Sequence, residues 1–205
     1  MPTDGLSICP LMNTRIEKGI TTRQHIVDVA TQLFTKSGYE ATSIEAILDA
    51  CCVSRGALYH HFSSKDELFL AVLEATEREI SAASVAAARN VTDPAESLRA
   101  GCRAFLELAR VDRVRQVALI DAPAVLGWQK WREVEERHGF GLLKASLKAA
   151  AKTRGLRREP VDVLAHMLLA ALIEAALLIA RGEDPAAAMR SCRAAVDRLI
   201  DGILA

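Results

Sequence analysis

The chain of 205 residues is long enough for one compact domain or for a small module joined to a larger one, and the second arrangement is the starting hypothesis. Half of its residues are hydrophobic (51%) and a quarter are charged (25%), a composition that builds a core and excludes a disordered protein. The 26 basic and 26 acidic side chains cancel, so net charge gives no argument for a nucleic-acid partner. Any contact with DNA must be local.

The cysteines indicate a reducing compartment. They are odd in number, lack the spacing of metal ligands and follow no signal peptide, so a cytoplasmic location is predicted. The five are Cys9, Cys51, Cys52, Cys102 and Cys192. The longest apolar stretch, residues 163–180, contains His166 and Glu174, and we interpret it as a buried or interface helix. A membrane span is the alternative, and no membrane partner is expected.

The first predicted element is a helix that begins near Thr21. Residues 1–20 show no periodicity and are expected to form a disordered arm, with Met12 as an alternative native start. The helix ends at Gly38, where a left-handed residue is favoured. Its apolar positions recur with a helical period at Ile26, Ala30, Leu33 and Phe34.

Helix-capping residues then mark the next three elements. A second helix is predicted to reach about residue 50, a third is predicted over about 54–62, and a long fourth helix extends from residue 65 towards residue 90. The capping residues are Thr42 with Glu45, Ser54, and Ser64 with Glu67.

Prolines and glycines divide the remainder of the chain. Pro94, Pro160 and Pro185 stand where a first helical turn tolerates proline, and Gly155 and Gly182 close helices. No segment shows the alternation of a strand, so the predicted fold class is all-α. The later helices are expected near residues 94–110, 113–121, 128–152, 160–181 and 185–204.

The third helix carries an unexpected glycine. Leu58 and Phe62 are four residues apart and can anchor one face, while Gly56 and His60 lie on the opposite, outward face. An exposed glycine costs about 1 kcal/mol of helix stability relative to alanine. Close approach to another surface is a reason to omit that side chain.

Two short helices, a tight turn at residues 51–53 and an outward polar face are the parts of a helix-turn-helix reading head. Residues 22–69, TRQHIVDVATQLFTKSGYEATSIEAILDACCVSRGALYHHFSSKDELF, resemble along their whole length the DNA-binding domain of the TetR (tetracycline repressor)/AcrR family of transcriptional regulators. The resemblance rests on Leu33-Phe34, Gly38-Tyr39, Thr42-Ser43-Ile44, Val53-Ser54, Leu58-Tyr59, His61-Phe62 and Lys65.

The resemblance implies a three-helix DNA-binding domain at residues 21–66 and an effector-binding and dimerisation domain at residues 67–205. Arg55 can pair with guanine, and Lys65 brings a point charge to a helix N-terminus. Six basic and five acidic residues between positions 15 and 65 leave the head nearly neutral, so few counterions should be released. The expected DNA contacts are Arg23, Thr42, Ser43, Arg55, Gly56, Ala57, Tyr59, His60, His61 and Lys65.

Cys52 departs from the family pattern, which usually has glycine at this turn position. Either cysteine adopts a strained positive φ, or the turn is rebuilt. A redox switch at Cys51 and Cys52 is a further alternative, although adjacent cysteines form strained disulfides. A metal site that joins them to His60 and His61 is disfavoured, because the two pairs are about two helical turns apart.

An effector cavity is expected in the larger half, where five aromatic residues lie on three predicted helices and would suit an apolar small molecule. Core packing is the alternative for each aromatic. Gly139 and Gly141 can leave room, and Arg132, Glu135 and His138 can supply polar contacts. The expected pocket residues are Phe69, Phe105, Trp128, Trp131 and Phe140.

The last two helices are strongly apolar and are expected to form a two-fold four-helix bundle, so residues 160–204 should make a homodimer that matches a palindromic operator. The function predicted is a repressor released from double-stranded operator DNA by a small apolar effector, without catalysis, cofactor or metal. The alternatives are a redox-responsive regulator, an activator or effector-free regulator, and a small helical enzyme, for which no nucleophile with a base or phosphate loop is found.

Overall fold

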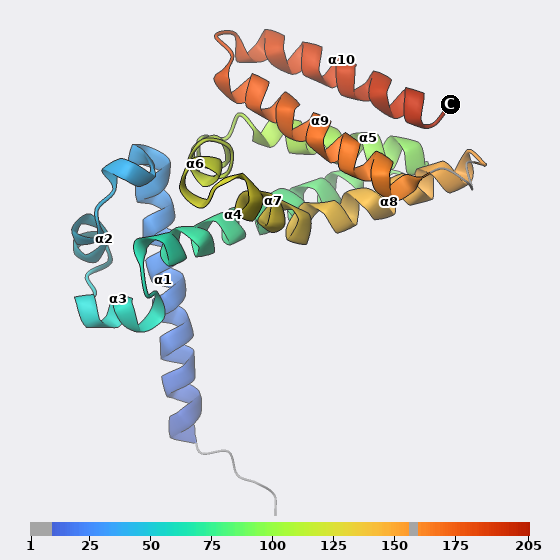
Figure 1. The fold of residues 1–205 in the computed structure, drawn as a ribbon. Coiled ribbons are helices and arrows are strands. Elements are labelled where there is room, and N and C mark those ends of the chain that lie inside the picture. The colour runs from blue at the N-terminus through green and yellow to red at the C-terminus, as the bar shows by residue number, and fades with distance from the viewer. Residues whose placement is uncertain (1–9, 156–159) are drawn as a thin grey trace, which may run out of the picture. The chain divides into compact units, whose positions relative to one another are not determined.

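The computed structural model describes residues 10–155 and 160–205, with side chains from Thr21 onward. Helices and no strand are found in these described segments, so the all-α prediction is confirmed (Figure 1). The chain forms two compact units that divide between Val72 and Leu73, inside helix α4. The two units are described separately below.

The first unit contains α1 (Pro10–Ala41), α2 (Ile44–Cys51), α3 (Arg55–His61) and the beginning of α4 (Lys65–Ala88). The helices enclose one apolar core, to which each of them contributes side chains. The largest fully buried members are Ile26, Phe34, Ile47, Leu58, Phe62, Leu68 and Phe69.

Helix α1 begins earlier than the sequence suggested. Residues 1–9 of the expected arm lie outside the described residues, but α1 starts at Pro10, so residues 10–20 are helical rather than irregular. A first-turn proline is compatible with a helix, and the glycine at position 19 weakens such a helix without ending it. The predicted end is found, because Gly38 has φ 76° and interrupts α1 there.

The cap of α2 lies one residue later than predicted. The Ser43 hydroxyl, rather than that of Thr42, accepts the Ala46 amide at 3.1 Å. Thr42 is buried, and its hydroxyl donates to the Gly38 carbonyl oxygen at 2.7 Å, because the break at Gly38 leaves that carbonyl available. Thr42 therefore closes the α1 break instead of opening α2.

The second unit begins within α4 and continues as a mostly helical chain. Its elements are α5 (Pro94–Leu108), the π-helix η1 (Val114–Asp121), α6 (Ala122–Leu126), α7 (Trp128–Glu135), the π-helix η2 (Glu136–Phe140), α8 (Gly141–Thr153), α9 (Val161–Arg181) and α10 (Pro185–Ile203). The long helix expected over residues 128–152 is thus interrupted by a π-helical turn. Gly127 (φ 76°) precedes α7, and Gly155 (φ 79°) follows α8, where the sequence predicts the end of a helix.

Helices α9 and α10 lie side by side, and α5 packs against α8, α9 and α10 (Figure 1). Their shared core is made of small and aliphatic side chains. At the edge of that core Arg99 of α5 forms an ion pair with Asp201 of α10, and Arg103 pairs with Asp197 at 2.8 Å. The charged pairs therefore connect the same two helices that the apolar core joins.

Among the helices that the structure describes, α9 alone is long and apolar enough, by length and composition, to cross a membrane. In the structure 44% of its apolar window is buried, and its inward residues belong to the core shared with α5, α8 and α10. Burial of this kind is typical of a core helix. The predicted buried or interface helix fits this packing better than a membrane span.

Candidate DNA-reading surface and ligand cavity

The turn between α2 and α3 contains a non-glycine residue with a positive φ, and it is the only one among the residues that the structure describes. Cys52 has φ 55° and ψ 35°, and its amide donates to the Asp49 carbonyl oxygen. Cysteine therefore occupies the left-handed position that suits glycine, at a strain of about 1–2 kcal/mol. Of the two alternatives for this turn, strain at Cys52 is the one found.

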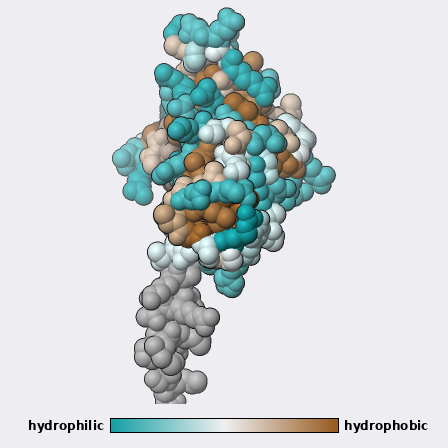
Figure 2. All heavy atoms as spheres, turned by 90° about the vertical axis from the view of Figure 1, so that its left-hand side faces the viewer, coloured by the Kyte–Doolittle hydropathy of each residue, from teal (hydrophilic) through white to brown (hydrophobic). Residues whose placement is uncertain are grey.

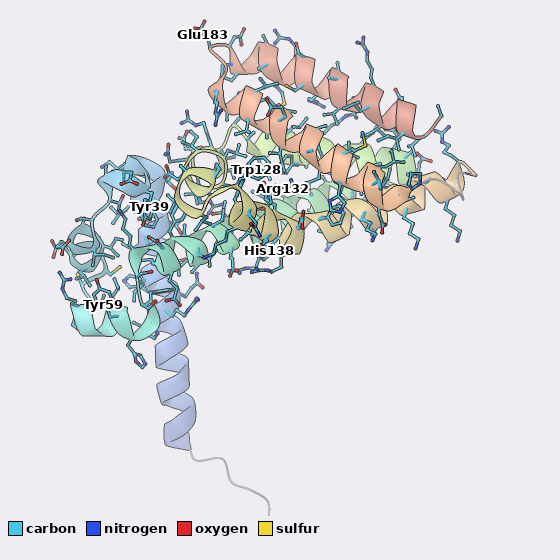
Figure 3. The ribbon with its side chains drawn as sticks, viewed as in Figure 1. Tyr39, Tyr59, Trp128, Arg132, His138 and Glu183 are labelled. Atoms are coloured by element: carbon cyan, nitrogen blue, oxygen red, sulfur yellow. The ribbon has the colours of Figure 1, made fainter. Side chains whose placement is uncertain are left out.

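Helix α3 has one anchored face and one open face. Leu58 and the following Phe62 are buried in the first unit, as the sequence predicted. On the other face Tyr59 is 43% exposed (Figure 3), and a methyl group added at Gly56 would meet no atom within 4 Å. Nothing inside the described protein therefore requires a glycine at position 56.

An ion pair connects this open face to α2. The Arg55 guanidinium donates to the Glu45 carboxylate at 2.6 Å, and both side chains are more than half exposed. The pair raises the pKa of Arg55 and lowers that of Glu45. An exposed pair contributes about 0–1 kcal/mol, so Arg55 is oriented by Glu45 yet can exchange this partner for a base or a phosphate.

Two of the expected phosphate ligands lie over aromatic rings. The Arg23 guanidinium carbon is 4.9 Å from the centre of the Phe62 ring, and the Lys65 ammonium is 3.9 Å from the centre of the Tyr39 ring. The Tyr39 hydroxyl donates to the Asp66 carboxylate, which fixes that ring. Cation–π contacts of this kind hold a cation in place while leaving its outer side accessible.

His61 cannot be expected to bring a positive charge to DNA near neutral pH. Burial lowers its pKa, and the neighbouring His60 and Arg23 lower it further. The neutral ring retains one N–H donor. His61 can therefore hydrogen-bond a phosphate but adds little to the salt dependence of binding.

The remaining expected contacts differ in exposure. Thr42 is buried and already hydrogen-bonded to Gly38, so we remove its side chain from the candidate surface. Ser43 is exposed but caps α2. Hydrophilic and hydrophobic residues are mixed on the face shown in Figure 2. The exposed candidates are Arg23, Ser43, Arg55, Gly56, Tyr59 and His60, and the half-buried ones are Ala57, His61 and Lys65.

Cysteine chemistry receives no support from the geometry. Cys51 is buried, and burial raises the pKa of its thiol, which disfavours the reactive thiolate. Cys51 and the exposed Cys52 are both free thiols. Within the described residues no group of three or more metal-binding side chains comes together.

The second unit contains a cavity of about 280 Å³ between α4, α5, η2, α8 and α9. Its walls are mostly aliphatic, and Phe105 is the aromatic side chain among its lining residues. Gly139 also lines it, as expected for a glycine that leaves room. The size suits a small organic molecule.

Four of the five aromatics expected in the pocket lie elsewhere. Phe69 is buried in the core of the first unit, and Trp131 is fully buried without lining the cavity. Trp128 (labelled in Figure 3) is 62% exposed. Its ring centre lies 5.0 Å from that of Trp131, and Phe140 stacks on His166 at 4.1 Å. The alternative of core packing holds for Phe69 and Trp131, because large rings fill cores as readily as they line pockets.

Among the polar residues that line the cavity, two carboxyl groups are buried. Glu77 of α4 is 5% exposed, and burial raises its pKa to about 7. Glu135 is 6% exposed, and burial together with the charge of Glu77 raises its pKa to about 8, although Arg132 lies 3.4 Å away. Glu135 was expected from the sequence as a polar contact of the cavity, whereas Glu77 was not. The sequence feature that could have identified Glu77 is an acidic residue on the apolar face of α4, between Leu73 and Ile80.

Known families match both units. Residues 95–203 match the family described as "Tetracyclin repressor-like, C-terminal domain", and residues 26–72 match "Bacterial regulatory proteins, tetR family". The chain belongs to the TetR family. It is accordingly a DNA-binding transcriptional regulator of a non-enzymatic family, and the recognition made from residues 22–69 is confirmed.

Individual TetR relatives support this membership. A TetR-family transcriptional regulator from Pectobacterium atrosepticum is 30% identical, with a TM-score of 0.80 over 91% of this chain and 96% of that chain. The regulator AcrR of Shigella flexneri is 48% identical over 59 residues, which are 29% of this chain and 27% of AcrR. The chain thus matches about a quarter of AcrR. RolR, whose structure contains resorcinol, is 20% identical to this chain and has a TM-score of 0.71. The comparison covers 93% of this chain and 96% of that chain, so RolR shares the fold.

Proposed function

We propose that this TetR-family regulator is a cytoplasmic homodimeric repressor that leaves a palindromic operator when a small molecule binds in the second unit. The observation that carries the DNA-binding part is the open face of α3. It is anchored behind by Leu58 and presents Arg55, Tyr59 and an unobstructed Gly56 outward. A helix with this arrangement suits the major groove, where Arg55 can pair with guanine.

Exposed apolar side chains on α9 and α10 support the dimer. On α9 Val163 is 56% exposed, Met167 63% and Leu178 54%, and on α10 Leu199 is 48% exposed. Large apolar groups this exposed on adjacent helices favour an interface between subunits. Two copies joined here present two reading heads, which a palindrome with half-sites about 34–36 Å apart requires.

The cavity supports the effector. Its lining includes Glu77, Ile80 and Ser81 of α4, the helix that begins at Lys65 beside the reading head. Lys65 and Glu77 belong to the same helix, so the helix that carries the buried carboxyl group of the cavity also carries an expected phosphate ligand. RolR, of the same fold, was crystallised with resorcinol, which is a precedent for a small ligand.

The test of base reading is Arg55→Ala. We expect it to weaken binding to the operator by about 1–3 kcal/mol while random DNA is bound almost as before, measured by fluorescence anisotropy on DNA from upstream of the gene. Arg110→Ala is the control, because Arg110 is an exposed arginine of the second unit. An unchanged ratio of specific to random binding in Arg55→Ala would contradict the role.

The test of the dimer is Leu178→Glu, examined by analytical ultracentrifugation. A charge in the proposed interface should shift the protein towards monomer and weaken operator binding. Val111→Glu is the control, because Val111 is also an exposed apolar residue (41%) but belongs to the segment between α5 and η1 rather than to α9 or α10. A stable monomer in the unsubstituted protein at micromolar concentration would refute the homodimer.

A further inference from the structure

We propose that the effector of this regulator is a hydrophobic monocation whose charged group pairs with Glu77 inside the cavity of the second unit. The inference rests on the proposed effector role of that cavity. It restricts the expected class of effector from apolar molecules in general to apolar molecules that carry one positive charge.

The first step is the lack of a partner for Glu77. Its side chain is 5% exposed, lines the cavity, and makes no hydrogen bond or ion pair with any of the residues that the structure describes. Buried carboxyl groups in proteins are normally paired or hydrogen-bonded, because desolvation without compensation is unfavourable. The cavity therefore offers an unpartnered carboxyl group to whatever enters it.

The second step is the sign of the charge around Glu77. The other buried carboxyl group of the cavity, Glu135, lies 3.4 Å from Arg132, and the same guanidinium is 3.6 Å from Glu136. Arg132 is therefore shared between two acids and is not available to Glu77. Arg89, the cationic residue that lines the cavity, is exposed. The buried part thus favours a cation and repels an anion.

The rest of the wall is mostly apolar. Leu98, Phe105, Leu143 and Leu169 line it, and the Ser81 hydroxyl already donates to the His138 carbonyl oxygen at 3.2 Å. A ligand therefore meets mainly aliphatic and aromatic surface, with the hydroxyl groups of Ser84, Ser97 and Ser146 as neutral polar groups and Glu77 and Glu135 as the buried acids. One charge on the ligand suffices, because Glu135 has Arg132 at 3.4 Å and a pKa raised to about 8, which keeps it largely protonated near neutral pH, while Glu77 has no counter-ion. The site is adjacent to η2, and π-helical turns often occur at functional sites.

Protonation of Glu77 gives the site a measurable signature. Burial raises the pKa of Glu77 to about 7, so near neutral pH the empty cavity holds this group partly protonated. A bound cation favours the carboxylate and lowers that pKa. Binding of a cation should consequently release a proton, whereas binding of a neutral ligand of the same shape should not.

The experiment compares three probes with one alkyl chain: octylamine, 1-octanol and octanoate. Isothermal titration calorimetry of the full chain near neutral pH should give at least tenfold tighter binding for the amine than for the alcohol, and the weakest binding for octanoate. Glu77→Gln keeps the side-chain volume and should remove the tenfold preference without changing the affinity for octanol. Glu133→Gln is the control, because Glu133 is an exposed carboxylate on α7 outside the cavity lining.

Two further readouts keep the outcomes distinct. Titration of octylamine in buffers of different ionisation enthalpy should show proton release in the unsubstituted protein and a smaller release in Glu77→Gln, in which Glu135 is the remaining buried acid of the cavity. Equal affinity for amine and alcohol, tightest binding of octanoate, or an amine affinity that Glu77→Gln leaves unchanged would overturn the cation. If one of these results is found but octanol releases operator DNA, the cavity is still an effector site and only the preference for a cation is refuted. Tight amine binding without any effect on operator affinity would support the cation site and refute the effector role.

Discussion

Replacement of Gly56 by alanine should change stability and DNA binding in opposite directions. The added methyl group meets no atom within 4 Å, and Gly56 does not have a positive φ, so the folded protein accepts alanine without strain. Alanine is also the better helix former inside α3. We expect the free energy of unfolding to rise by about 0.4–1 kcal/mol, measured by urea denaturation.

The same methyl group should weaken operator binding. It lies on the open face of α3 between Arg55 and Tyr59, where it would hold the helix away from the groove floor. Loss of one good base contact corresponds to about 1–3 kcal/mol, which fluorescence anisotropy on operator DNA can resolve. Gly141→Ala is the matched control: Gly141 is helical, exposed and equally open, but lies in the second unit. A more stable Gly56→Ala protein with unchanged operator affinity would refute this face as the contact surface.

Three other perturbations have defined outcomes. Lys65→Ala should weaken specific and random DNA binding alike and reduce the salt slope by about one, and a loss confined to the operator would contradict phosphate contact. The free energy of unfolding without ligand should fall on the order of 3 kcal/mol from about pH 5 to about pH 8, because folding raises the pKa of Glu77 to about 7 and stability is lost as pH rises through that value. Urea denaturation of Glu77→Gln should show a flatter pH dependence, with the remaining slope from Glu135, whose pKa is also raised, and a slope equal to that of the unsubstituted protein would assign it to other groups. Arg99→Ala should lower the free energy of unfolding by about 1–3 kcal/mol through loss of its Asp201 partner, and Asp201→Asn should lower it less, since the asparagine oxygen can still accept a hydrogen bond.

Local signals explain why the reading head was predictable. The break at Gly38, the capping role of Ser54 and the burial of Leu58 and Phe62 each depend on a few neighbouring residues, and each is found where the sequence places it. The error at Thr42 has the same origin. Threonine can cap a helix or close a break with equal chemistry, and only the carbonyl oxygen left free at Gly38 decides between the two.

The cavity was less predictable because it depends on packing between distant helices. Trp131 and Phe105 have the same aromatic character in the sequence, yet one fills the core and the other lines the cavity. A charged residue on a buried helix face is the more informative signal, since a carboxyl group is seldom buried without a reason. Applied to α4, that rule selects Glu77, whereas a search for aromatic residues does not.

Glu77 also bears on how a ligand can act as a switch. To release DNA, an effector must bind the released form more tightly than the DNA-bound form, so operator DNA must weaken ligand binding by the same factor. An unpartnered buried carboxyl group makes that difference easier to build, because a small displacement of Glu77 changes an ion pair in a low-dielectric cavity far more than it changes apolar contact. Since Glu77 belongs to the helix that begins at Lys65, a displacement of α4 along its axis would move both the carboxylate that holds the ligand and the cation expected to hold the phosphate. A cationic effector would thus gain its selectivity between the two forms from the ion pair, and the alkyl body would supply affinity common to both.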